Sequence, residues 1–77
     1  MNKERRQRIE KVCDKLEELL EEIVEIKEDE LECYCNLPKY SQEGMRGIVM
    51  YDMVEAMDNA ERSIAHAKGC LAEIYER

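Results

Sequence analysis

Two long stretches of the chain repeat apolar residues at alternating spacings of three and four, and a single proline lies between them. The first stretch contains Ile9, Val12, Leu16, Leu19, Ile23 and Ile26, and the second contains Met50, Met53, Met57, Ala60, Ile64, Ala67, Leu71 and Ile74. This spacing is typical of the a and d positions of a coiled coil, so each stretch is predicted to form a long helix. With 77 residues, one Pro and three Gly, the chain has the size and composition of one small all-α domain.

Residues 36–41 interrupt the pattern. Pro38 cannot continue a helix, and it also disfavours the helical conformation at Leu37. Asn36 suits the C-cap of the first helix, and Ser41 suits the N-cap of the second. The predicted fold is an antiparallel two-helix coiled-coil hairpin. It is a single domain over 1–77, with a helix over about 3–35, a turn over 36–41 and a helix over about 42–76.

The two apolar runs also predict how the helices are aligned. A short connection makes consecutive helices antiparallel neighbours. If the numbers of facing residues add to about 76, every a residue of one helix meets a d residue of the other, as Leu16 meets Ala60. In this alignment both runs are buried inside the hairpin except for Leu71 and Ile74, which lie opposite Arg5 and Asn2 and find no apolar partner there.

Further apolar residues line one flank of each predicted helix, outside the a and d positions. Two helices cannot cover all of this surface, and a homodimer in the form of a four-helix bundle would cover it. The rival interpretation is that the flank docks on a different protein. The predicted dimer face consists of Leu20, Val24, Leu31, Tyr51, Val54, Leu71, Ile74 and Tyr75.

Charge is distributed unevenly along the chain. The net charge is −7, which disfavours nucleic-acid binding because nucleic acid carries the same sign. Cations gather within residues 1–11 and acids within 14–32. The acidic side of the first helix is either a solvated surface or a display of negative charge toward a basic groove on a partner. The candidate partner-binding residues are Glu18, Glu21, Glu22, Glu25 and Glu28, with Tyr34 and Arg46 near the turn.

Residues that catalyse reactions or bind cofactors are nearly absent. His66 and Cys70 lie four residues apart and supply two metal ligands, not the four of a structural zinc site. The chain has no glycine-rich phosphate loop and no dinucleotide fingerprint. We therefore expect no enzymatic activity, no cofactor and no metal. Because there is no apolar run of roughly 20 residues and no secretory h-region, we expect no membrane association, a cytoplasmic location and reduced cysteines.

The residues around the turn form a recognisable motif. They read Glu32-Cys33-Tyr34-Cys35-Asn36-Leu37-Pro38, followed by Gln42, Arg46-Gly47 and Met50. This segment resembles that of small, uncharacterised helical-hairpin proteins of Firmicutes and their bacteriophages, in which an acidic first helix ends in a Tyr-x-Asn-Leu-Pro turn. The resemblance implies a phage or prophage setting and supplies no activity.

These observations favour a non-enzymatic protein–protein interaction module that forms a homodimer. In its most concrete form it is a phage- or prophage-encoded inhibitor of a host defence or regulatory protein. One alternative is a nucleic-acid-associated accessory protein that acts through the basic N-terminal end. The other is a purely structural small coiled-coil protein.

Overall fold

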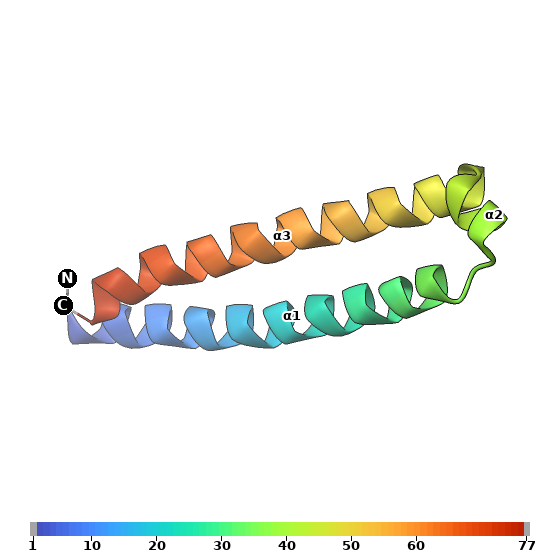
Figure 1. Cartoon of the computed structure of the whole chain (residues 1–77). Helices are drawn as coiled ribbons and strands as arrows, with labels where there is room; N and C mark the ends of the chain where they lie inside the picture. The colour runs from blue at the N-terminus through green and yellow to red at the C-terminus, as the bar shows by residue number, and fades with distance from the viewer. Residues whose placement is uncertain (1, 77) are drawn as a thin grey trace.

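The chain folds into a long helical hairpin (Figure 1). The computed structural model describes residues 2–76, except for the side chain of residue 75. Helix α1 spans Lys3–Cys35, a short helix α2 spans Lys39–Glu43, and helix α3 spans Met45–Tyr75. The rod measures 58 × 14 × 13 Å. The predicted helical hairpin is confirmed, and the two ends of the chain lie together at the end opposite the turn.

Local capping sets the ends of α1. The Asn2 side chain accepts a hydrogen bond of 2.9 Å from the Arg5 amide, which satisfies one of the free donors of the first turn. At the other end Asn36 is the C-cap, as predicted, and its amide donates to the Glu32 carbonyl. Pro38 follows two residues later, so α1 cannot continue.

The predicted turn over 36–41 is wrong in one respect, because part of it is helical. Ser41 does not cap the second long helix but lies inside α2, which begins after Pro38, and Gly44 is the N-cap of α3. The Gln42 side chain explains this extra turn of helix. Its amide nitrogen donates to the carbonyls of Tyr34 and Leu37, at 3.1 and 3.2 Å. The Tyr34 carbonyl lies in the last turn of α1 and also accepts from the Leu37 amide, and the Leu37 carbonyl lies in the connection. Gln42 therefore ties α2 to the end of α1.

The sides of α1 and α3 that face each other are rotated from the predicted ones, although Ile9, Leu16 and Ile23 remain half-buried. Val12, Leu19 and Ile26, predicted to be buried, are 44%, 49% and 57% exposed. The residues that follow them by one position are buried or half-buried against α3. We call these the inner rows, which are Arg6, Cys13, Leu20, Lys27 and Tyr34 on α1, and Gly47, Val54, Glu61 and Lys68 on α3.

The predicted alignment of the helices is also wrong. The Tyr34 and Tyr51 rings meet at 6.2 Å between centroids, Lys27 pairs with Asp58, and Glu17 pairs with Lys68. In each of these pairs the residue numbers add to 85, not to about 76. The cause is the turn, because the first residues of α3 extend beyond the end of α1 and pack on α2 instead.

Gly47 allows that packing. A Cβ atom at position 47 would lie 2.1 Å from the carbonyl oxygen of Gln42, so only glycine fits where α2 meets α3. Gly69, also inside α3, has no atom within 4 Å of such a Cβ.

We expect Gly47→Ala to lower the free energy of unfolding by about 1–3 kcal/mol, because the added methyl group must displace the α2 backbone. The matched variant Gly69→Ala should raise it by about 0.5–1 kcal/mol, because alanine is the better helix former and the site is open. Urea unfolding followed by circular dichroism measures both. Equal stability gains for the two variants would contradict the α2–α3 contact.

Candidate interaction surface

One side of the hairpin carries a continuous exposed apolar surface. Successive residues of a helix are rotated by about 100°. Because α1 and α3 are antiparallel, the residues that precede the two inner rows project to the same side of the hairpin. We call this side the apolar face. It is formed by the exposed residues Val12, Leu19 and Ile26 on α1 and Met53 and Ala67 on α3, with Ile9, Leu16, Ile23 and Ala60 half-buried beside them.

The predicted dimer face lies elsewhere, and part of it is used inside the hairpin. Val54 is only 9% exposed, so it cannot belong to an exposed face. Tyr51 is exposed and packs on Tyr34, and the side chain of Tyr75 lies outside the described residues. The remaining members are half-buried, and these are Leu20, Val24, Leu31, Leu71 and Ile74. Dimerisation itself stays a prediction, and four of the exposed apolar residues were expected to close the hairpin, namely Val12, Leu19, Ile26 and Met53.

The five acids predicted to bind a partner are all exposed. They follow one another at spacings of three and four, so they are neighbours along one stripe of α1. Glu18 and Glu25 point away from α3, with Glu21 and Glu28 on one side of them and Glu22 on the other, at the outer edge of the apolar face. The stripe has the arrangement of a solvated helix surface, and binding of a partner there stays a prediction.

The two residues predicted near the turn have different surroundings. Tyr34 is half-buried against Tyr51, with an angle of 55° between the ring planes, and its carbonyl accepts the Gln42 hydrogen bond. Arg46 is exposed at the start of α3. Within residues 2–76 the structure gives Arg46 no ion pair.

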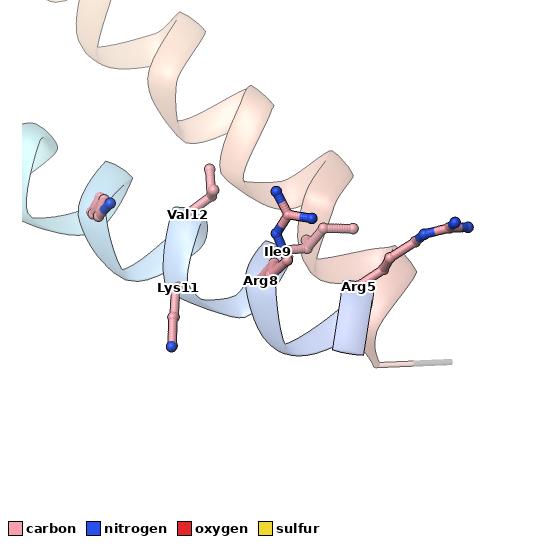
Figure 2. Close-up of a pocket in the computed structure, with 6 residues that line it drawn as sticks. Arg5, Arg8, Ile9, Lys11 and Val12 are labelled. Atoms are coloured by element: carbon pink, nitrogen blue, oxygen red, sulfur yellow. The ribbon is translucent and has the colours of Figure 1, made fainter. Parts of the chain in front are cut away.

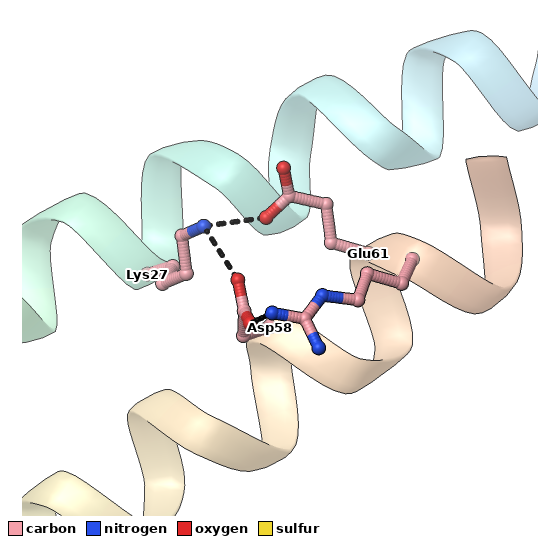
Figure 3. Close-up of polar contacts among 4 residues, drawn as sticks. Lys27, Asp58 and Glu61 are labelled. Carbon is pink, nitrogen blue, oxygen red and sulfur yellow. Dashed lines mark hydrogen bonds and ion pairs between the residues drawn. The ribbon is translucent and has the colours of Figure 1, made fainter.

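A charged cluster lies between the helices near the middle of the rod (Figure 3). Lys27 belongs to the inner row of α1, and its side chain is only 17% exposed. Its ammonium group donates to Glu61 at 2.5 Å and to Asp58 at 3.4 Å. Asp58 also pairs with Arg62 at 2.8 Å. One feature of the sequence could have indicated this position of Lys27. Lys27 is seven residues from Leu20 and seven from Tyr34, which places all three on one side of α1.

These contacts favour the protonated form of Lys27. The hydrogen bond to Glu61 raises the pKa of Lys27 above that of a free lysine, with the bond to Asp58 and the two negative charges acting in the same direction. Partial burial opposes the shift. A second interhelical ion pair joins Glu17 to Lys68. Together the two contacts fix the antiparallel alignment, because a sliding of either helix would separate the charges.

The N-terminal part of α1 carries a shallow basic groove of about 510 Å³ (Figure 2). Its apolar lining comes from Ile9 and Val12, at one end of the apolar face. Four cations surround these two side chains, and these are Arg5, Arg8, Lys11 and Lys15. Such a groove suits a segment that presents apolar side chains flanked by acids.

Other chemistry on the described residues is sparse. The His66 Nε2 atom lies 3.6 Å from the Cys70 sulfur. Within the described part of the chain, no three His, Cys, Asp or Glu residues are grouped to hold a metal ion. The four cysteines are free, with Cys13 buried and 2% exposed. No helix over residues 2–76 has the length and apolar character to cross a bilayer.

Comparison of the chain with protein-family models, with curated proteins and with solved structures gives no match. The resemblance of the turn motif to phage and Firmicutes hairpin proteins therefore stays a prediction.

The Lys27 cluster predicts a dependence of stability on alkaline pH. A lysine whose pKa is raised by folding contributes stability that is fully present below about pH 10.5, the ordinary pKa of the group, and is lost as pH rises through the higher pKa of the folded state. We expect Lys27→Gln to lower the unfolding midpoint in urea at pH 8. The difference from the unsubstituted protein should shrink as the pH is raised above about 10.5.

Lys39→Gln is the control for this experiment, because Lys39 is exposed on α2 and has no ion pair within the described residues. The urea unfolding midpoint of the Lys39→Gln variant should equal that of the unsubstituted protein at each pH. A Lys27→Gln variant that behaves like the Lys39→Gln variant would contradict a stabilising role for the cluster.

Proposed function

We propose that the protein is a non-enzymatic protein–protein interaction module that associates with other helices through its apolar face. One observation carries the proposal. Of the apolar side chains that the structure describes, only Cys13 and Val54 are buried in the hairpin. A core of this size is far below what a small domain needs for independent stability. The missing burial must come from a partner.

The form of the exposed surface supports helices as the partner. On α1 the apolar face keeps the three-and-four spacing of a coiled coil, with Val12, Leu19 and Ile26 exposed and Ile9, Leu16 and Ile23 half-buried. Such a row packs best against another helix, whose side chains fill the spaces between its own. A homodimer that forms a four-helix bundle is the simplest assembly that satisfies this requirement.

The host-directed form of the proposal is an inhibitor of a host defence or regulatory protein. It is supported by the turn motif alone. Arg46 is the exposed cation of that motif, so it is the first residue to change once a partner is identified.

The proposal predicts self-association through the apolar face. In sedimentation velocity at micromolar concentrations, we expect a species of twice the 9.1 kDa chain mass. Leu19→Glu should raise the dissociation constant by about two orders of magnitude, because it places a charge within an apolar interface. Ile48 is as exposed as Leu19, at 51% against 49%, but projects to the other side of the hairpin. Ile48→Glu is therefore the matched control and should leave the dimer intact.

A chain that sediments as a monomer at every concentration would count against the module. So would equal effects of the two substitutions, because the interface would then not be the apolar face.

The second candidate function is that of a nucleic-acid-associated accessory protein, and the basic groove is the observation that favours it. The net charge of −7 opposes it. We expect no mobility shift of duplex DNA at low salt. A shift that disappears in the double variant Arg5→Gln/Lys11→Gln would favour this alternative instead.

A further inference from the structure

A row of charged residues follows the outer edge of the apolar face. It consists of Arg8, Lys15, Glu22 and Asp29, spaced by seven residues along α1. We call it the edge row. All four side chains are exposed, and none forms an ion pair within the described hairpin. Read from the N-terminus, the row has two positive charges followed by two negative charges.

This order of charges is complementary to itself in the reverse direction. Suppose that a second copy of α1 lies antiparallel to the first, so that the residue numbers of each pair in the edge rows add to 37. Arg8 then meets Asp29 of the second copy, and Lys15 meets its Glu22. Two-fold symmetry repeats both pairs, so all four contacts join opposite charges. With the helices parallel, the two-fold axis would place the two edge rows on opposite sides of the interface, so the edge residues would not pair with one another.

The apolar residues agree with the same alignment. When paired core residues add to 35, Leu16 meets Leu19 of the second copy, Val12 meets its Ile23, and Ile9 meets its Ile26. At each end of this apolar stretch, Arg5 of one copy lies opposite Glu30 of the other copy. The residue numbers add to 35 for the core pairs and to 37 for the edge pairs. This difference of two residues corresponds to about 3 Å along a helix, which the long charged side chains can span.

The basic groove has a complementary segment within the same chain. Ile9 and Val12 line it between cations, and the alignment brings to it the Ile23 and Ile26 side chains of the second copy. Three acids accompany those two side chains, and these are Glu22, Asp29 and Glu30. The groove thus receives apolar side chains flanked by charges opposite to its own.

We infer that the partner of the apolar face is a second copy of this chain, docked with its α1 antiparallel to α1 about a two-fold axis near residues 17–18. This inference rests on the proposed function, because it requires the apolar face to be an interface. It adds the direction of the paired α1 helices and the charge pairs that select this direction.

Charge reversal tests the arrangement. Arg8→Glu and Asp29→Arg, each made alone, should raise the dissociation constant of the dimer about tenfold at low salt, because each reverses two symmetry-related contacts. The double variant Arg8→Glu/Asp29→Arg should return it to within about twofold of the original value, because every pair is again of opposite sign. The differences should fade at about 1 M salt.

The controls make the same charge changes away from the edge row. Glu28 is the neighbour of Asp29 but projects to the opposite side of the hairpin, and Lys39 lies on α2. Glu28→Arg, Lys39→Glu and their double variant should each stay within about twofold of the original dissociation constant. Circular dichroism checks that every variant remains helical, which is expected because the changed side chains are exposed.

A dimer that responds to edge-row and control variants alike, or that the reciprocal double variant does not restore, would overturn this inference and leave the proposed function standing. A protein that remains monomeric before any substitution would overturn both.

Discussion

Lys27 donates from the C-terminal half of α1 to two carboxylates of α3, and this contact holds the inner rows toward each other. With the helices rotated in this way, Val12, Leu19 and Ile26 face outward, while Ile9, Leu16 and Ile23 stay half-buried. The α2 corner acts in the same direction, because Gly47 lets α2 pack directly on α3 while Gln42 holds it against the end of α1. Most other features of the molecule follow from this rotation.

The main consequence is that the hairpin buries little and exposes a surface adapted to helices. Polar contacts can specify the alignment of two helices, but they add little to stability compared with apolar burial. The hairpin therefore has a defined shape without a large core of its own. The apolar face and the edge row that borders it are the parts of α1 left to form a core with a partner, and the order of charges in that row favours a second copy over an unrelated helix.

The sequence predicted the two long helices, the interruption at Pro38 and the C-cap at Asn36, because these depend on local periodicity and backbone chemistry. It did not predict the rotation of the helices. The apolar surface of α1 is wide enough for two neighbours, and periodicity does not tell which neighbour belongs to the same chain. Lys27 also concealed the inner row, because a lysine between Leu20 and Tyr34 interrupts the apolar pattern until its acidic partners are known. Helix α2 depends on the Gln42 side chain, which reaches across the corner to the end of α1. The local sequence patterns that indicate helices and turns do not predict such a contact.

Leu19 and Ile26 face outward, whereas Val54 faces α1 of its own chain. An isotope-filtered nuclear Overhauser experiment on a mixture of labelled and unlabelled protein tests this arrangement, because such spectra separate methyl contacts between copies from those within one copy. We expect contacts between copies from the Leu19 and Ile26 methyl groups, and contacts only within one copy from Val54. Contacts between copies from Val54, with Ile26 touching Met50 of its own chain, would contradict it.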